Sequence, residues 1–126
     1  MSAAAASDIT MAIAPQWADI RDGVAKVCEA FPNEYWVKLD HAAEYPGEFV
    51  KALTDAGYLG ALIPEEYGGS GYTYVELGIV LEEMGRSLLC APFFSAVVLA
   101  ANTLLHSGDE AAKSAHLPGI ASGETI

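Results

Sequence analysis

The most constraining feature of the sequence is an uncharged run of nineteen residues, SLLCAPFFSAVVLAANTLL, from Ser87 to Leu105. Apolar side chains cover most of the circumference of the helix that this run predicts, from Pro92 to the residue before Gly108. A helix that is apolar on nearly every side must be covered on nearly every side. The short helices predicted elsewhere in a chain of 126 residues cannot easily supply that cover. We therefore expect another domain, another subunit or an apolar ligand to pack on residues 92–107.

The same run is close to the length of a membrane-spanning helix, so a small membrane-associated helical protein is one alternative. Against a span, Pro92 interrupts the run, and Ser95, Asn102 and Thr103 are polar. The apolar part after Pro92 is only about fourteen residues long, a length typical of a buried core helix. A buried helix is therefore favoured over a membrane span.

Helical periodicity dominates the rest of the chain, and no pair of strands is evident. The sequence predicts an all-α fold, a small orthogonal or up-down bundle of about five to six helices. Besides residues 92–107, the predicted helices cover residues 15–31, 34–44, 46–57 and 73–88, with a last short helix after Asp109. From Leu117 onward, the segment LPGIASGETI predicts turns and extended chain.

The helix that begins at Thr73 carries the clearest local signals. Thr73 opens an S/T-x-x-E capping box, and Glu82 can pair with Arg86 one turn further on. Gly78 and Gly85 lie seven residues apart at the edge of the apolar stripe. Each costs about 1 kcal/mol of helix propensity relative to alanine, which predicts a close helical neighbour that needs the space.

The composition excludes several classes of function. Six basic against seventeen acidic residues leave a formal charge of -11, which disfavours nucleic-acid binding and anionic membrane surfaces. The N-terminal MSAAAASDIT has neither the basic residue nor the apolar segment of a secretory signal. Cys28 falls on an apolar helical face, which favours a reduced, buried thiol, although the sequence leaves a disulfide with Cys90 open. We expect a cytoplasmic protein.

The segment LIPEEYGGSG, from Leu62 to Gly71, places two carboxylates and three glycines behind a proline. It lacks the lysine of a phosphate-binding loop, and two glutamates would repel a phosphate. Glu65 and Glu66 could form an acid/base pair, but no nucleophile or histidine accompanies them locally. A Pro-initiated turn with glycines at positive φ is the favoured interpretation.

No complete catalytic or metal-binding motif is present in the sequence. His41, His106 and His116 share no metal-ligand spacing, and no serine lies in a nucleophile motif. His106 at the end of its helix is more simply placed against the negative helix terminus. We therefore assign no catalytic residue and no metal site to this chain.

Two segments resemble the N-terminal helical domain of acyl-CoA dehydrogenases. The first is YPGEFVKALTDAGYLGALIPEEYGGSGYTYVELGIVLEEMGRS, and the second is AAKSAHLPGIASGETI. In that family a proline-led helix, an IPEEYGG corner, a helix ending in EEMGRS and an LPxIASGE element occur in this order. The resemblance covers approximately residues 34–126.

The resemblance implies a flavoprotein with an N-terminal helical domain, a β-domain and a C-terminal helical bundle. A glutamate would remove the proton next to the thioester carbonyl of an acyl-CoA, as in fatty acid β-oxidation. FAD would take a hydride from the β-carbon, giving a 2,3-enoyl-CoA, and pass electrons to an electron-transfer flavoprotein. The cofactor would supply the redox chemistry, and the protein would supply position and electrostatics.

The chain ends before the flavin-contacting and catalytic segments that the resemblance implies. We therefore expect a fragment or truncated form that alone binds no FAD and turns over no substrate. The predicted division is a flexible tail over residues 1–14, a helical domain over residues 15–117 and the start of a linker to a β-domain over residues 118–126.

In the family, the helix that matches Pro92 to Leu105 forms one wall of the acyl cavity. The resemblance thus implies four substrate-binding candidates on one helix face, Phe94, Val98, Ala101 and Leu105. Packing against neighbouring helices is the simpler role for any one of them. A non-catalytic interaction module, or a partner subunit of a heteromeric acyl-CoA dehydrogenase, is the remaining alternative.

Overall fold

The computed structural model describes residues 15–126, and within this range the chain is helical with no strand. The all-α prediction is confirmed, whereas the predicted tail over residues 1–14 lies outside the described residues. Three short or irregular helical segments complete the fold, the 3-10 turns η1 (Pro15–Trp17) and η2 (Glu65–Tyr67) and the π-helix η3 (Phe94–Ala101). The α-helices are α2 (Ala18–Glu29), α3 (Asn33–Ala42), α4 (Gly47–Asp55), α5 (Tyr74–Arg86), α6 (Asn102–His106) and α7 (Glu110–Ala121).

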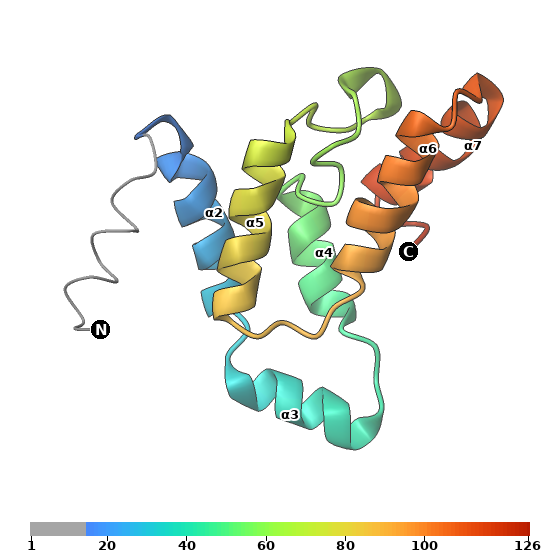
Figure 1. Cartoon of the computed structure of the whole chain (residues 1–126). Helices are drawn as coiled ribbons and strands as arrows, with labels where there is room; N and C mark the ends of the chain where they lie inside the picture. Colours follow the sequence, from blue (N-terminus) through green and yellow to red (C-terminus); the bar gives the residue numbers. More distant parts are fainter. Residues whose placement is uncertain (1–14) are drawn as a thin grey trace.

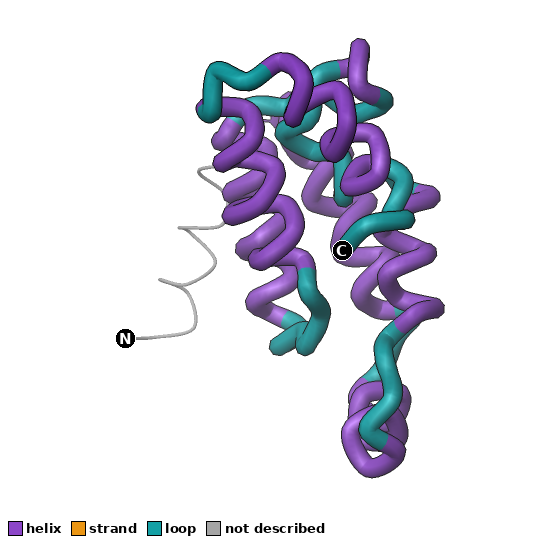
Figure 2. The backbone as a smooth tube through the Cα atoms, turned by 90° about the vertical axis from the view of Figure 1, so that its right-hand side faces the viewer, coloured by secondary structure: helices purple, strands orange, loops and turns teal. Residues whose placement is uncertain are grey.

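The helices form an upright group with one helix lying across its lower end. Helices α2 and α5 pack side by side, and η3 and α6 form one continuous helix on the other side of α4 (Figure 1). Helix α7 turns back and packs against α6, η3 and η2. Helix α3 projects below the rest of the molecule (Figure 2).

The main core lies between α2, α4, α5 and the start of η3. Val24, Phe49, Leu53, Val80 and Val97 are its most deeply buried members, and they come from these elements at helical spacings. Burying side chains of this size contributes about 1.5–3 kcal/mol each. The sequence pattern of the amphipathic helices therefore accounts for the assembly of this core.

Helix α3 has no buried residue and is held mainly through aromatic contacts. Phe31 contacts Tyr35 and Phe49 edge to face, with ring centroids 4.9 and 5.2 Å apart. Trp36 lies 5.0 Å from the Phe49 ring, and its Nε1 donates a hydrogen bond to the Phe31 carbonyl at 3.0 Å. These rings join the start of α3 to α4.

A second, smaller core holds the IPEEYGG corner against the C-terminal helix. Ile63 from the corner, Ala101 from η3, and Leu117 and Ile120 from α7 bury one another. Gly68 and Gly71 in the corner have φ of 84° and 62°, which confirms the predicted glycine turn. The corner is therefore a structural joint.

The C-terminal helix is longer than predicted. Helix α7 continues to Ala121, so the prediction of turns and extended chain from Leu117 is wrong for its first part. Pro118 costs a helix interior about 3 kcal/mol. Burial of Leu117 and Ile120 offsets that cost. The helical part thus crosses the predicted boundary at residue 117, while the linker role of the last residues stays a prediction.

The start of α5 is capped as predicted, but its two glycines lack the close helical neighbour that the sequence predicted. The backbone N–H of Thr73 donates to Glu76 at 2.9 Å, and the Thr73 hydroxyl accepts from the N–H of Val75. A Cβ added at Gly78 or Gly85 would meet no described atom within 4 Å. The predicted close neighbour is therefore absent from residues 15–126, because this side of α5 faces open space.

Candidate functional site

The centre of the uncharged run is a π-helix rather than the α-helix predicted for it. In η3 the backbone hydrogen bonds span one residue more per turn than in an α-helix. Side chains that a period of 3.6 would align therefore rotate away from one another. Both ends add bonds from side chains to carbonyls, from Ser95 to Pro92 at 3.0 Å and from Thr103 to Leu99 at 2.7 Å.

This winding separates the four substrate-binding candidates. Phe94 is 56% exposed, whereas Ala101 is fully buried in the second core. Val98 and Leu105 are half-buried against the main core, and Leu105 also contacts the second core. The four residues thus differ in exposure, with Ala101 turned inward, and their role in substrate binding stays a prediction. Leu99, which was not predicted, lies exposed instead.

A shallow groove lies between the end of α5 and the start of η3. It has a volume of about 230 Å³ and is lined almost entirely by apolar residues. Leu88 follows α5 with its side chain 84% exposed and its φ at 49°, a conformation unusual for leucine. The lining consists of Leu81, Met84, Gly85, Leu88, Leu89, Ala91, Phe93 and Phe94.

A polar cluster joins the start of α5 to α6, the helix that continues η3, at the end of these helices away from the groove. The Tyr74 hydroxyl lies 2.6 Å from Asn102 Oδ1 and 2.9 Å from His106 Nε2. The sequence indicated that Asn102 is polar and that His106 lies at the end of the same helix, but it did not single out Tyr74, which is 28 residues before Asn102. No local spacing could have indicated that contact.

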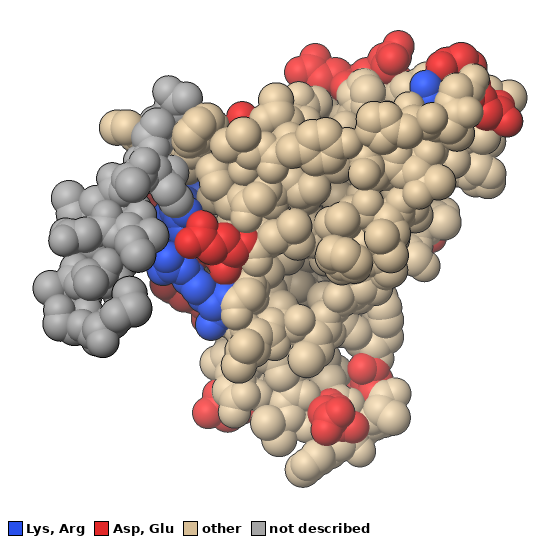
Figure 3. All heavy atoms as spheres, in the orientation of Figure 1, with Lys and Arg blue, Asp and Glu red and all other residues tan. Residues whose placement is uncertain are grey.

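The face formed by α5, η3 and α6 is largely free of charge. In Figure 3 the acidic and basic side chains gather at the rim, and the centre of this face shows neither kind. For a chain with seventeen acidic residues this is a marked segregation. Contiguous uncharged, apolar surface of this kind marks a binding or packing site.

Most basic groups are already held by carboxylates away from this face. Arg21 on α2 donates to Glu82 at 2.8 Å and to Glu83, which is buried, and Arg86 lies 3.5 Å from both carboxylates. Hydrogen bonding from Arg21 lowers the pKa of the Glu82 carboxyl. The predicted pairing of Glu82 with Arg86 is thus confirmed within a larger cluster that joins α2 to α5.

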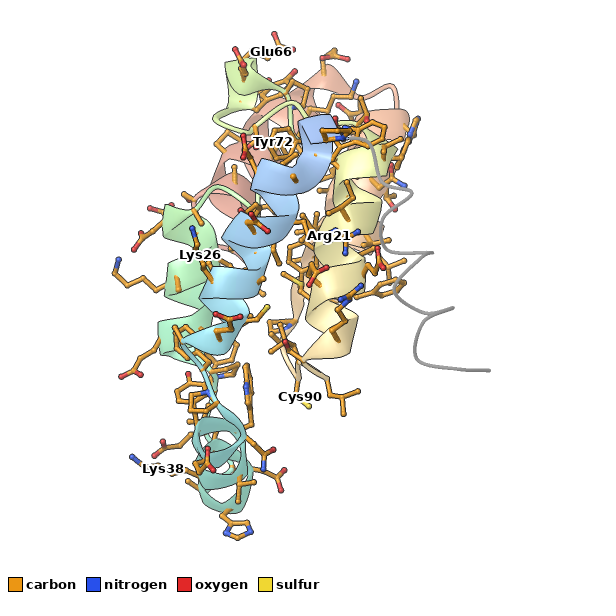
Figure 4. All side chains as sticks on the ribbon, turned by 90° about the vertical axis from the view of Figure 1, so that its left-hand side faces the viewer. Arg21, Lys26, Lys38, Glu66, Tyr72 and Cys90 are labelled. Atoms are coloured by element: carbon orange, nitrogen blue, oxygen red, sulfur yellow. The ribbon has the colours of Figure 1, made fainter. Side chains whose placement is uncertain are left out.

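The remaining basic groups do not approach the uncharged face. Lys51 pairs with Asp55 at 2.5 Å, and Lys113 pairs with Glu110 at 2.7 Å. Lys26 and Lys38 lie on the other side of the molecule, on α2 and α3 (Figure 4). The diphosphate of FAD needs cationic or N–H donors. Among the described residues, no lysine or arginine on the uncharged face therefore offers a cation to the diphosphate of FAD.

The other sequence candidates are dispersed. Glu65 and Glu66 point outward from η2, and the nearby Tyr67 hydroxyl donates to Glu110 at 3.1 Å. Residues 15–126 contain no group of three His, Cys, Asp or Glu side chains that could hold a metal ion. Cys28 is a buried free thiol whose pKa is raised by burial, and Cys90 is a free, exposed thiol.

Comparison with known proteins identifies the family. A family model described as the acyl-CoA dehydrogenase N-terminal domain matches residues 15–124. The chain belongs to the acyl-CoA dehydrogenase family. A probable acyl-CoA dehydrogenase of Bacillus subtilis, YngJ, is 34% identical over 92 residues, covering 70% of this chain and 24% of that protein. The mitochondrial isovaleryl-CoA dehydrogenase of Pongo abelii is 34% identical over 111 residues, covering 85% of this chain and 26% of that protein.

A solved structure shares the fold of this acyl-CoA dehydrogenase domain. It is described as the electron transferring flavoprotein of Acidaminococcus fermentans, and it matches with a TM-score of 0.74 and 25% identity. The match covers 90% of this chain and 30% of that chain. The chain thus spans about a quarter of the length of the curated relatives above. Among the helices of residues 15–126, none has both the length and the apolar character needed to cross a membrane.

Proposed function

We propose that this chain is the N-terminal helical domain of an FAD-dependent acyl-CoA dehydrogenase, which oxidises an acyl-CoA thioester to the 2,3-enoyl-CoA. Its uncharged face supplies part of the acyl-pocket wall and packs against the remaining domains. The observation that carries the proposal is the apolar groove of that face, where Leu88 and Phe94 stay exposed although half of the chain is apolar. Family membership and the coverage of the relatives support it.

Within this proposal, the four candidate residues have different roles. Phe94 contacts the acyl chain directly, since it lines the groove and is more than half exposed. Val98 continues the wall one turn further along the helix. Ala101 and Leu105 pack behind the wall and hold its position, because both contact the second core.

The redox chemistry and the catalytic base belong to segments outside this chain in the proposal. When bound, FAD accepts the hydride from the β-carbon of the substrate. The described residues contribute no cation for its diphosphate, because four of the six basic side chains are paired and the other two lie on the opposite side. The electrons then pass to an electron-transfer flavoprotein, which is the partner proposed for the whole enzyme.

The acyl wall is tested with Phe94→Asp in the complete product of the gene that encodes this chain. The dissociation constants of butanoyl-, octanoyl- and hexadecanoyl-CoA are measured by calorimetry. The variant should bind the best of the three at least about tenfold more weakly, because a buried carboxylate in an acyl pocket is unpaired. Tyr45→Asp is the matched control, since Tyr45 is 57% exposed on another part of the molecule, and it should bind as the wild type does.

Two results would contradict the proposal. Equal acyl-CoA affinity in Phe94→Asp and wild type would contradict the placement of Phe94 in the pocket wall. A gene product that binds no acyl-CoA would contradict the proposed function as a whole. A defined complex with a separate chain, seen by mass measurement without acyl-CoA binding, would favour the partner-subunit alternative.

A further inference from the structure

The uncharged face carries two facing stripes of residues that run in opposite directions. On α5 the stripe is Tyr74, Gly78, Leu81 and Gly85, which follow one another at steps of four, three and four residues. On η3 and α6 it starts at Phe94 and reaches Asn102 and His106. The two ends of this arrangement are fixed by contacts. Gly85 and Phe94 line the apolar groove at one end, and Tyr74 bonds to Asn102 and His106 at the other.

The space between those ends is open along α5. A side chain at Gly78 would meet no described atom within 4 Å, so the surface between Tyr74 and Leu81 has no bulk on the α5 side. The eight residue steps from Phe94 to Asn102 span at most roughly 12 Å along the helix. The absence of a side chain at Gly78 thus leaves an uncovered strip between the apolar groove and the Tyr74 contacts.

The polar end has hydrogen-bonding capacity left over. One phenolic hydrogen serves the 2.6 Å contact to Asn102 Oδ1, and the Nε2–H of His106 can then donate to the same Tyr74 oxygen. That arrangement uses only the acceptor side of Asn102 and leaves both hydrogens of its amide nitrogen as donors. Tyr74 itself is 58% exposed, so a ligand can reach the cluster.

The charge distribution selects a neutral ligand group. No lysine or arginine is visible on the central part of this face, and the chain carries a formal charge of -11. A carboxylate at the polar end would meet amide and imidazole donors but no arginine or lysine, and it would be repelled by the overall field. A hydroxyl or carbonyl oxygen meets the same donors without that repulsion.

We propose that Tyr74, Asn102 and His106 form the far end of the acyl site and recognise a neutral oxygen, a hydroxyl or a carbonyl, at the distal end of the acyl group. This inference rests on the proposed acyl-wall function. It adds the substrate class, an acyl-CoA whose chain is apolar along Gly78 and oxygenated beyond it. The hydrogen bonds from Tyr74 to Asn102 and His106 also limit the length of the acyl chain that this site admits.

The test compares hydroxylated with plain acyl-CoA of equal length, using the complete gene product. Dissociation constants are measured by calorimetry for 8-hydroxyoctanoyl- against octanoyl-CoA, and for 12-hydroxydodecanoyl- against dodecanoyl-CoA. At the better-fitting length the hydroxylated ligand should bind about five- to tenfold more tightly, the effect of one to two net hydrogen bonds. Tyr74→Phe should reduce that preference to less than twofold, because it removes the hydroxyl that holds Asn102 and His106 in place.

The control and the contradicting results separate this inference from the proposed function. Tyr45→Phe removes a hydroxyl of nearly equal exposure elsewhere and should keep the full preference. Equal binding of hydroxylated and plain ligands overturns the inference alone, as does a preference that survives Tyr74→Phe. Tighter binding of the ω-carboxylate octanedioyl-CoA than of the hydroxylated ligand also overturns it. Absence of binding by every acyl-CoA overturns the proposed function and this inference together.

Discussion

Two adjacent glycines in the IPEEYGG corner are required for different physical reasons. Gly68 has a φ of 84°, but a Cβ on it would meet no described atom within 4 Å. Gly69 has no such φ, yet its Cβ would lie 1.9 Å from the Ile63 carbonyl oxygen. Two backbone hydrogen bonds hold the two sides of this corner together at that point, from Gly69 N–H to the Pro64 carbonyl at 3.1 Å and from Gly71 N–H to the Ile63 carbonyl at 2.9 Å. One glycine is needed for its conformation and the other for space.

Alanine substitutions should separate these two requirements. Gly68→Ala should lower the free energy of unfolding by about 1–2 kcal/mol, the cost of a left-handed conformation in an alanine. Gly69→Ala should lower it by at least about 3 kcal/mol, because the backbone of Ile63 must move. Urea denaturation of both variants measures the difference. Equal losses in the two variants would show that space at Gly69 is not limiting.

At the scale of elements, the cluster of Arg21 with Glu82 and Glu83 is the only ion-pair contact between α2 and α5 described in residues 15–126. The guanidinium and the Glu83 carboxylate are both largely withdrawn from solvent, and Arg21 Nε has no partner among the described atoms. Removing one partner from a buried ion pair leaves an uncompensated charge, which costs more than the pair itself contributes.

Arg21→Met should therefore lower the free energy of unfolding by about 3 kcal/mol. Lys51→Met, which breaks the exposed pair with Asp55, should cost less than about 1 kcal/mol. The pKa of Glu82 is depressed in the folded state, so its stabilising contribution is present above its ordinary pKa and is lost as pH falls through the depressed value. The wild-type urea midpoint should fall between roughly pH 5 and pH 3, and it should fall less in Arg21→Met. An equal fall in both would exclude the Arg21 contact as the cause.

The limits of sequence reasoning follow from the range of the interactions involved. The capping box at Thr73 and the glycine turn that contains Gly68 were predicted because each depends on residues within a few positions of one another. The Arg21 contact to Glu83 spans 62 residues and has no local signature. The helix through Pro118 and the π-turns of η3 were missed because tertiary burial overrides the local preference at both places. For the same reason the burial of Ala101 in the second core was not predicted, while its part in substrate binding stays a prediction.

For the whole molecule, the uncharged face is the surface feature on which the proposed packing against other domains rests. Leu88, Phe94 and Leu99 are all more than half exposed, and the first two line the same groove. Acidic side chains lie at the rim of this face in the view of Figure 3. A surface with a charged rim and an apolar centre has the anatomy of an interface.

Replacing Leu88, Phe94 and Leu99 together by serine should weaken self-association of the 126-residue chain at least about tenfold, because burial of the apolar centre drives it. Sedimentation velocity over a range of concentrations measures the effect, and binding of a hydrophobic dye should fall in parallel. The control changes Val37 and Tyr45 to serine, which are exposed apolar residues on another part of the molecule. A wild-type chain that stays monomeric and binds no dye would contradict the expectation.

The wide winding of η3 has a consequence for how such a wall can change over generations. Losing one codon between Phe94 and Ala101 would take out the extra residue of a wide turn and return that turn to the tighter α-form, while the helix after it keeps nearly the same orientation. Asn102 would then stay opposite Tyr74, and only the side chains between Phe94 and Ala101 would change face. A lineage could thus exchange the lining of its pocket through a single deletion, without disturbing the polar contact at its end.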